Sequence, residues 1–323
     1  MTNDRHTGKA ASGRRWPVAI AAALGGCALV AASTVPAAAH GKAHGKAHGR
    51  ATDYVSLGDS YTSGPLIPDQ VDTNCARSNR NYPSVVAAAR GVATFKDMSC
   101  GGATTEHMWT AQGTNDPQLS ALRRDTDLVT LQIGGNDMGF GTIIATCAAL
   151  GAQEPTGDPC RRHYTASGSD ELTAAIDRTA PKVARVLKAV HAKAPHARVL
   201  VVGYPDLLPD DGVGCFPTVP FGSKDFPYLR DTEKQLNSML RTVAERHHVE
   251  YVDTYGPTRG HDMCKAPEDR WIEPLQPTSP AAPAHPNAKG EAVMARAVLD
   301  HLDKGHGHEH GHGHGNGHGH GRH

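Results

Sequence analysis

The stretch Tyr54-Val-Ser-Leu-Gly-Asp-Ser-Tyr-Thr-Ser-Gly64 decides the fold prediction. Its first four residues supply the aromatic, β-branched and apolar side chains of a short buried strand, and Gly58 lets the chain leave that strand abruptly. In an open parallel sheet, ligands bind outside the carboxyl ends of the strands. Ser60 is therefore expected where a hydroxyl would face a ligand, although a Gly-Asp-Ser turn without catalytic function fits the same residues.

Apolar runs typical of strands alternate with longer amphipathic segments across residues 51 to 304. The expected strands are 53–58, 93–98, 128–134, 198–203 and 249–253. The expected helices are 83–90, 172–192, 232–246 and 287–302. Because crossover helices bring successive strands back parallel, we predict an α/β fold, a three-layer α/β/α sandwich with a central parallel sheet of about five strands.

The overall composition limits the function. The chain carries 33 Lys and Arg against 33 Asp and Glu, so no net charge attracts nucleic acid or an anionic membrane. Nucleic-acid binding is disfavoured as a main function. Residues 51–304 suit one catalytic domain with a full core, which we expect to be a monomer without a cofactor.

Residues 1–39 are typical of an export signal peptide. Arg14-Arg15 precede an apolar run from Val18 to Val35, and Ala37-Ala-Ala39 offer small residues for cleavage. The paired Arg residues fit a twin-arginine signal and an ordinary secretory signal alike. Leu24-Gly-Gly-Cys27 leaves a lipid anchor open as an alternative, and an uncleaved membrane anchor is another. We expect cleavage and a secreted, extracellular protein without a stable membrane anchor.

Two segments rich in His and Gly flank the predicted domain, a linker at 40–50 and a tail at 305–323. Alternating Gly and His offers no apolar surface to offset the ordering of the backbone, so we expect both to be disordered. Neutral imidazoles of the tail would bind Zn²⁺, Ni²⁺ or Cu²⁺ weakly. A solvated extension without a metal-dependent function is the alternative.

The chain has seven Cys, of which Cys27 lies in the signal segment. An even number of Cys behind an export signal predicts disulfides. Their spacing lacks the paired Cys-x-x-Cys ligands of a structural zinc site. Spacing alone does not choose the pairing of the remaining six, which are Cys75, Cys100, Cys147, Cys160, Cys215 and Cys264.

Three further stretches contain residue types that suit catalysis. Cys100-Gly-Gly-Ala-Thr-Thr105 follows the second expected strand, Gly134-Gly-Asn-Asp137 follows the third, and His285-Pro-Asn-Ala-Lys-Gly290 stands near the end. If the sheet is parallel, the stretches that follow strands meet Ser60 at one edge. The sequence therefore predicts one composite site.

These blocks, in this order, resemble those of SGNH hydrolases of the GDSL lipase and esterase superfamily, in particular secreted actinobacterial lipases with three disulfides. The resemblance covers essentially the whole predicted domain and implies the SGNH hydrolase fold, hydrolysis of carboxylic esters and sequential disulfides. The matching blocks are Gly58-Asp59-Ser60, Gly102, Gly135-Asn136-Asp137 and His285. The implied disulfide pairs are Cys75 with Cys100, Cys147 with Cys160, and Cys215 with Cys264.

The residue types suit this chemistry. Ser60 must lose its proton as it attacks an acyl carbonyl, so it needs a base within hydrogen-bond reach. His285, with an ordinary pKa of about 6.5, would accept that proton and return it to the leaving alcohol. The main-chain N–H groups of Ser60 and Gly102 and the side-chain amide of Asn136 would stabilise the oxyanion. A turn-stabilising role is the alternative for Asn136.

One position departs from the family pattern. Many members carry Asp three residues before the catalytic His, where this chain has Ala282. In the lipases that it resembles, a main-chain carbonyl there can take the role of the Asp. We therefore expect the carbonyl of Ala282 to orient His285, with Glu273 or Asp269 as the alternative acceptor.

The leading hypothesis is a secreted serine esterase or lipase that hydrolyses lipid or small acyl esters. A carbohydrate O-acetyl esterase or a phospholipase would use the same site, because the fold and the nucleophile do not set the acyl pocket. From a different class, a secreted His-rich metal-binding protein on an inactive hydrolase scaffold is an alternative. The joint presence of Ser60, Gly102, Asn136 and His285 speaks against it.

Overall fold

A parallel sheet of five strands runs through the computed structural model, which describes residues 52–306. The order of the strands across the sheet is β4-β1-β5-β6-β7. The sequence prediction of five parallel strands is therefore confirmed. The strands are β1 Asp53–Gly58, β4 Thr94–Asp97, β5 Leu128–Gln132, β6 Arg198–Val202 and β7 Glu250–Val252.

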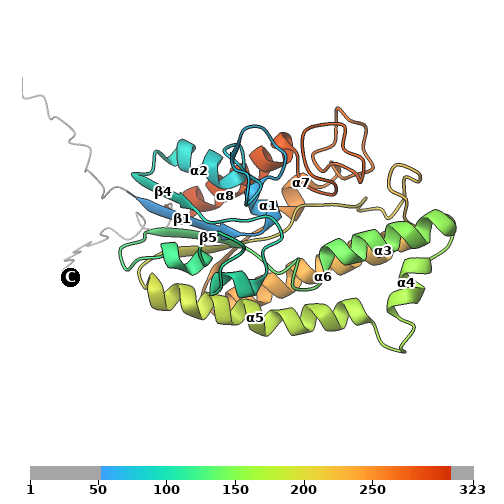
Figure 1. Ribbon diagram of the computed structural model, residues 1–323, viewed down its shortest axis with the longest axis horizontal. Coiled ribbons are helices and arrows are strands. Elements are labelled where there is room, and N and C mark those ends of the chain that lie inside the picture. Colours follow the sequence, from blue (N-terminus) through green and yellow to red (C-terminus); the bar gives the residue numbers. More distant parts are fainter. Residues whose placement is uncertain (1–51, 307–323) are drawn as a thin grey trace, which may run out of the picture. The chain divides into compact units, whose positions relative to one another are not determined.

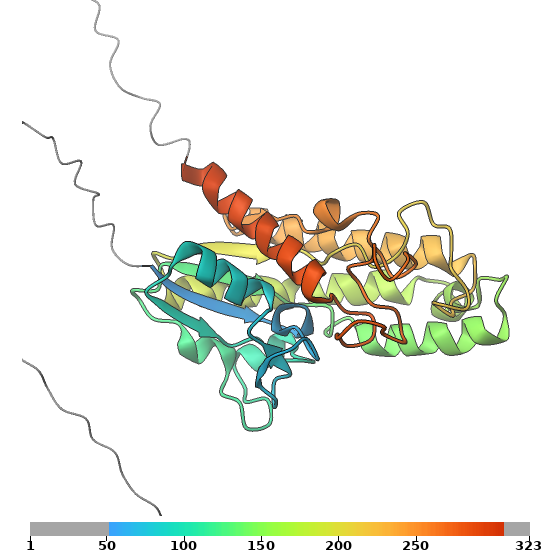
Figure 2. The ribbon, with the colours of Figure 1, turned by 90° about the horizontal axis from the view of Figure 1, so that it is seen from above.

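Helices cover both faces of the sheet, as a three-layer sandwich requires (Figure 1). On one face α2, Tyr82–Arg90, packs against α8, Ala288–His306. On the other face α5, Glu171–Lys193, packs against α6, Asp225–Arg246. Seen from above, α2 and α8 cross the strands side by side (Figure 2).

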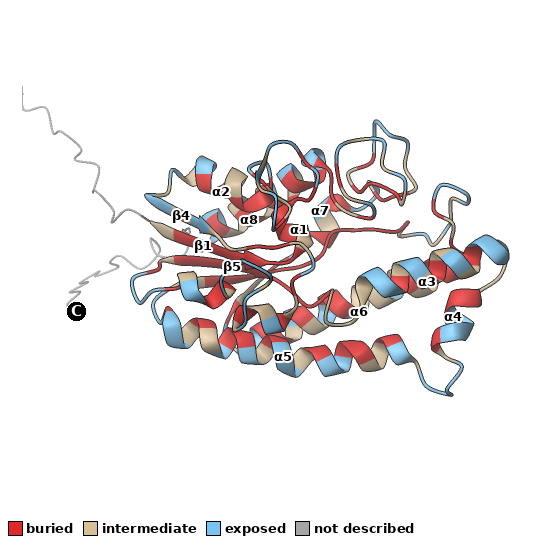
Figure 3. Ribbon diagram, viewed as in Figure 1, coloured by how far each residue is buried: buried red, intermediate tan, exposed pale blue. Residues whose placement is uncertain are grey.

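Strand β1 shows how alternation divides the core between the two layers. Tyr54 belongs to the cluster that includes Tyr82 and Val298 of the α2 and α8 layer. Val55 and Leu57 belong to the other cluster, on the side of α5 and α6. Full burial of one apolar side chain stabilises the folded state by about 1.5–3 kcal/mol. The strands of the sheet are largely buried, so their side chains stabilise the contacts with both helix layers (Figure 3).

Apart from helices of four residues, two helices of the described chain were not predicted. They are α3, Phe140–Gln153, and α4, Pro159–Tyr164. Helix α3 contains no charged residue, so its sequence lacks the alternation of polar and apolar faces on which a helix prediction depends. Helix α6 also begins seven residues before the expected residue 232.

The remaining elements are short and lie mainly in the connections. They are α1 Ser60–Ser63, β2 Gln70–Asp72, β3 Arg77–Ser78, α7 Tyr255–Thr258 and the 3₁₀ helices Thr105–Met108 and Gln118–Ala121.

All three implied disulfides are present: Cys75–Cys100, Cys147–Cys160 and Cys215–Cys264. The first joins the segment after α1 to the segment after β4. The N–H of Gly101 also donates to the carbonyl of Cys75 at 2.8 Å. This pairing holds the neighbouring Gly102 close to the end of β1.

Several sequence expectations fall on parts of the chain that are not described. The export signal at 1–39, the linker at 40–50 and the tail beyond residue 306 lie outside the described residues. Between residues 52 and 306, no helix is both long enough and apolar enough to cross a membrane.

Candidate active site

Ser60 lies at the carboxyl end of β1, at the first residue of α1. The preceding Asp59 caps this helix, since its Oδ1 accepts the N–H of Tyr61 at 3.0 Å. Gly58 is required by close packing, because a Cβ there would lie 2.1 Å from Oγ1 of Thr62 and 2.9 Å from the carbonyl oxygen of Gln132. The expected special backbone conformation is not the reason, since Gly58 has no positive φ.

Asp59 also ties together the loops that follow three strands. Its Oδ2 accepts the hydroxyl of Tyr204 at 2.5 Å, and that hydroxyl in turn accepts the N–H of Gly135 at 2.9 Å. Burial raises the pKa of Asp59 to about 7, against the hydrogen bonds from Tyr204 and Tyr61. The loops after β1, β5 and β6 are thus fixed relative to one another, a role that the sequence analysis did not assign to Asp59 or Tyr204.

His285 is within hydrogen-bond reach of the nucleophile. Its Nε2 lies 2.7 Å from Oγ of Ser60, and its Nδ1 lies 2.8 Å from the carbonyl oxygen of Pro283. A carbonyl can only accept, so Nδ1 carries the proton and Nε2 faces Ser60 with its lone pair. Burial lowers the pKa of His285, whereas the bond to Pro283 raises it, with a net fall. The ring is therefore a neutral base.

The prediction of Ala282 as the orienting carbonyl is wrong. The main chain does orient the ring, but through Pro283. The carbonyl of Ala282 instead accepts the main-chain N–H of His285 at 3.2 Å and closes a tight turn. In this turn, the carbonyl of Pro283 is the one that reaches Nδ1.

Neither alternative carboxylate reaches the ring. Burial alone would raise the pKa of Glu273, but hydrogen bonds from the Asn287 side chain and the N–H groups of Thr278 and Ser279 lower it overall. Both oxygens of Glu273 therefore hold its own loop. Asp269 is exposed, and no carboxylate within residues 52–306 hydrogen bonds to His285.

The turn that carries His285 is anchored on both sides. Ala284 adopts a left-handed conformation with φ of 59°, which costs an L-residue roughly 1–2 kcal/mol. Its N–H donates to the carbonyl of Glu273 at 3.1 Å, and its carbonyl accepts the hydroxyl of Tyr61 at 2.6 Å. The Tyr61 ring stacks on His285 with centroids 4.7 Å apart. Tyr61, the residue after Ser60, thus supports the ring of His285.

The three N–H donors predicted from the sequence each keep a hydrogen for which the described residues provide no acceptor. Ser60 occupies the first position of α1, where an N–H has no intrahelical acceptor. Gly102 has a φ of 76°, and its N–H has no main-chain acceptor among the described residues. Nδ2 of Asn136 donates one hydrogen to the carbonyl of Ala103 at 2.9 Å, which leaves the second one free to bind substrate.

The backbone conformation favours glycine at position 102, because its φ is positive. Packing does not require it, since a Cβ would meet no protein atom closer than Nε2 of Gln112 at 3.9 Å. Gly102 lines a surface groove together with Ser60 and His285.

Asp137 joins the two loops that supply these donors. Its Oδ2 accepts the N–H of Thr105 at 2.8 Å, and its Oδ1 accepts the Thr105 hydroxyl at 2.6 Å. The loop that carries Asn136 is thereby tied to the loop that carries Gly102. No role was predicted for Asp137 from the sequence, although its position beside Asn136 was an available signal.

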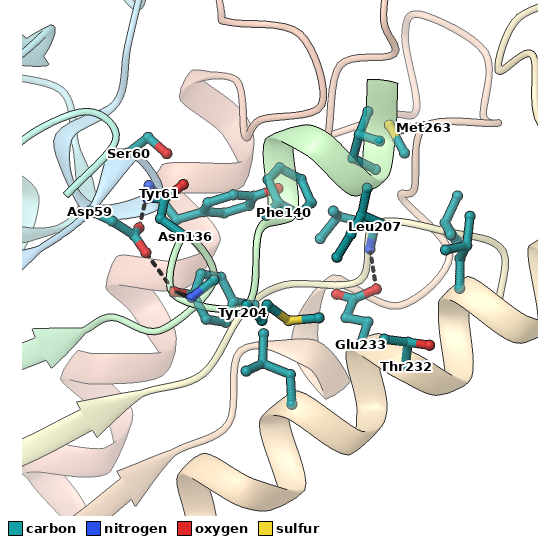
Figure 4. A pocket seen from close by; sticks show the side chains of 17 residues that line it. Asp59, Ser60, Tyr61, Asn136, Phe140, Tyr204, Leu207, Thr232, Glu233 and Met263 are labelled. Atoms are coloured by element: carbon teal, nitrogen blue, oxygen red, sulfur yellow. Dashed lines mark hydrogen bonds between the residues drawn. The ribbon is translucent and has the colours of Figure 1, made fainter. Parts of the chain in front are cut away.

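A deeper cavity leaves the groove at Ser60 and Asn136 and extends between α3 and α6 (Figure 4). Its walls are mostly apolar, and its far end holds Thr232 and Glu233. A mostly apolar lining with few polar groups is typical of a small-molecule binding site. The apolar walls include Met138, Ile143, Leu207, Leu229, Leu236 and Met263.

Residues 52–306 contain no group of three or more His, Cys, Asp and Glu side chains arranged to hold a metal ion.

Comparison with known proteins identifies the family of the chain. Residues 56–293 match the model of the GDSL-like lipase/acylhydrolase family. The chain belongs to this family. One relative, Lipase 2 of Streptomyces coelicolor, is 43% identical over 256 residues, which cover 77% of this chain and 85% of that protein.

Two solved structures are also similar. Phospholipase A1 from Streptomyces albidoflavus NA297 has a TM-score of 0.66 and 29% identity, and the match covers 78% of this chain and 99% of that one. The extracellular lipase from Streptomyces rimosus has a TM-score of 0.64 and 27% identity, with the same coverage of 78% and 99%. This GDSL family member is a carboxylic ester hydrolase, a lipase or esterase.

Proposed function

We propose that this enzyme hydrolyses fatty acyl esters through a covalent intermediate on Ser60, with His285 as general base and acid. The observation that carries the proposal is the 2.7 Å contact between Oγ of Ser60 and Nε2 of His285 at the mouth of an apolar cavity. This geometry matches the requirement that a nucleophile and its base lie within hydrogen-bond reach.

In the first half of the reaction, Oγ of Ser60 attacks the ester carbonyl carbon as its proton moves to Nε2 of His285. The carbonyl oxygen becomes an oxyanion, which accepts hydrogen bonds from the N–H groups of Ser60 and Gly102 and from Nδ2 of Asn136. The bond to the leaving oxygen then breaks, and that oxygen takes the proton from Nε2. The result is an acyl-enzyme and a free alcohol.

In the second half, water gives a proton to Nε2 of His285 and attacks the acyl carbon. The bond to Oγ of Ser60 breaks, and Oγ recovers the proton from Nε2. The Pro283 carbonyl keeps the ring in the tautomer that both halves require, because it accepts the Nδ1–H throughout. A neutral acceptor stabilises the imidazolium less than a carboxylate would.

The cavity supports a lipid substrate over an acetylated sugar. Its apolar walls begin at Ser60, where the acyl carbon is attached, so an acyl chain would extend into them. An acetyl group would leave most of this surface unused. A carbohydrate O-acetyl esterase is therefore the less favoured use of the site.

A phospholipase is the second candidate, because the phospholipase A1 from Streptomyces albidoflavus has the same fold with a TM-score of 0.66. The two lipid classes share an acyl chain and differ in the leaving alcohol. Incubation with trioctanoylglycerol and with dioctanoyl phosphatidylcholine, followed by titration of the released acid, decides between them.

We also propose that the enzyme acts outside the cell, after removal of residues 1–39. The signal-like sequence and the three disulfides support this location, since disulfides persist in oxidising compartments. The relative from Streptomyces rimosus is an extracellular lipase.

The direct test uses an alkyl p-nitrophenyl phosphonate, which traps an activated serine. We expect stoichiometric loss of p-nitrophenyl ester hydrolysis, and peptide mass spectrometry should place the phosphonyl group on Ser60. A label on another residue, or full activity after labelling, would overturn the mechanism.

A further inference from the structure

The far end of the cavity contains a polar group that the mechanism does not use. Glu233 of α6 lines the cavity on the side away from Ser60 (Figure 4). Its Oε2 accepts the N–H of Leu207 at a long 3.3 Å. Its Oε1 is enclosed and has no hydrogen-bond partner in the described part of the chain. A buried polar atom left without a partner costs about 1–3 kcal/mol, so its presence in an apolar wall requires an explanation.

The other polar side chains of the cavity wall differ from Glu233 in this respect. The hydroxyl of Tyr204 is bonded to Asp59 and to Gly135, as described above. The hydroxyl of Tyr61 donates to a carbonyl, and that of Thr232 donates to the carbonyl of Tyr228 at 2.9 Å. Glu233 is thus the wall residue, away from the catalytic groups, that keeps an unused hydrogen-bonding position.

The charged groups around Glu233 favour its neutral form. Burial and the nearby carboxyl of Asp206 hold the pKa of Glu233 well above its usual range, and Asp262 acts in the same direction. Lys234 opposes them, but its ammonium group is paired with Asp210 at 2.5 Å. In the neutral carboxyl, Oε2 is the carbonyl oxygen because it accepts the N–H of Leu207, and Oε1 carries the proton that can be donated.

We propose that Glu233 is a specificity-determining residue, which selects acyl groups that carry a hydroxyl or another hydrogen-bonding oxygen some distance from the scissile ester. The Oε1–H donates to that oxygen while the chain between it and Ser60 lies along the apolar walls. This inference rests on the proposed function, because it assigns the cavity to the acyl group. An unsubstituted chain of the same length leaves the Glu233 hydroxyl without its partner and is hydrolysed less efficiently.

The experiment uses p-nitrophenyl esters of straight-chain acids in which a single hydroxyl is moved carbon by carbon along the chain. We measure kcat/KM for each ester relative to the unsubstituted ester of equal length. The wild-type protein should prefer one position of the hydroxyl by about tenfold, the equivalent of one net hydrogen bond of roughly 1.4 kcal/mol. No preferred position along the chain would overturn the proposal and would indicate that Oε1 binds only water.

Two variants of Glu233 distinguish a role in selecting the acyl group from a role in supporting the loop that carries Leu207. Glu233→Leu should reduce the preference ratio to about 1, because no donor remains, and should favour the unsubstituted chain. Glu233→Gln should keep a preference, since its amide oxygen accepts from Leu207 and its NH₂ group donates into the cavity. A purely supporting role would change both kcat/KM values equally and leave the ratio unaltered, which would contradict the proposal.

The acetate ester serves as the internal control because its acyl group ends near Ser60. Its kcat/KM should stay within about twofold in both variants, which shows an intact catalytic centre. If the wild-type protein hydrolyses no ester, acetate included, the proposed function fails; hydrolysis of acetate without a preferred hydroxyl position defeats only the inference about Glu233. Should Glu233→Leu fail to fold, the wild-type scan and Glu233→Gln still decide the outcome.

Discussion

The two ends of the cavity differ in how their polar groups are satisfied. At the catalytic end, Asp59, Tyr61 and Tyr204 form hydrogen bonds that hold neighbouring loops together. The hydrogens left unused there belong to the N–H donors of Ser60, Gly102 and Asn136. At the far end the free group is Oε1 of Glu233. At both ends, the side chains named here that hold the loops together are hydrogen-bonded, and the unused groups named here are those that would act on substrate in the proposed mechanism and in the proposed selection. In the proposed mechanism, the catalytic end would stabilise a transition state, whereas the far end would also recognise the ground-state chain.

The largest effect at the catalytic end should come from Ser60→Ala. Loss of the nucleophile should lower kcat by about 10⁴-fold or more without a change in thermal unfolding. Ser63→Ala is the matched control in the same short helix, because Oγ of Ser63 is buried and has no partner in the described residues. That variant should keep full activity. Equal losses in the two variants would show a structural role for the hydroxyls of α1.

Asn136→Ala should have the next largest effect. Removal of one side-chain donor should lower kcat by about 10²–10³-fold and leave KM nearly unchanged, since the donor acts on the oxyanion. Asn136→Asp keeps the shape of the side chain but has no N–H to donate, so it should lose a similar factor. If the Asp variant retains wild-type kcat per folded molecule, Asn136 only supports its turn.

Asp137→Asn tests the tie between the two donor loops. The new NH₂ group would replace one acceptor of the Thr105 N–H or hydroxyl and loosen Gly102 relative to Asn136. A small displacement of donors should lower kcat by about 10- to 100-fold. Asp177→Asn on the exposed face of α5 removes the same charge elsewhere and should have no effect. Equal kinetics for the two variants would remove the positioning role from Asp137.

Glu273→Gln should separate stability from catalysis. Its NH₂ group would face Nδ2 of Asn287, so the free energy of unfolding should fall by about 1–3 kcal/mol. The kcat per folded molecule should stay within about threefold, because the ring of His285 is bonded to Pro283 instead. A fall in kcat approaching that of His285→Ala would show that a carboxylate orients the base.

The elements that sequence predicted best are those with a local signal. The five strands are short apolar runs bounded by turn residues, and α5 has a clear apolar stripe. Helix α3 has no charged face, so no period distinguishes it from a loop rich in Ala and Gly. The start of α6 was missed, although Phe226 and Leu229 of its first turns already belong to its buried apolar face.

The residues of the site also divide into those with a local sequence signal and those without one. Ser60, Gly102, Asn136 and His285 stand in short blocks that the resemblance carried over, and the structure places them around one groove. The orienting carbonyl depends on the geometry of a single turn, and a shift of one residue moved it from Ala282 to Pro283. Glu233 lies in an amphipathic helix, where a Glu is expected to face solvent. Only the packing of Leu207 against α6 shows that its carboxyl is enclosed.

The central claim is that a histidine oriented by the Pro283 carbonyl suffices as the base for Ser60. Its most direct test is the pH dependence of kcat/KM for a p-nitrophenyl ester. Burial lowers the pKa of His285, and the neutral ring is the active form, so activity should persist as the pH falls and be lost only below the ordinary value of about 6.5. An acidic limb with a midpoint above about 6.5 would indicate a charged partner that stabilises the imidazolium, and would contradict the account.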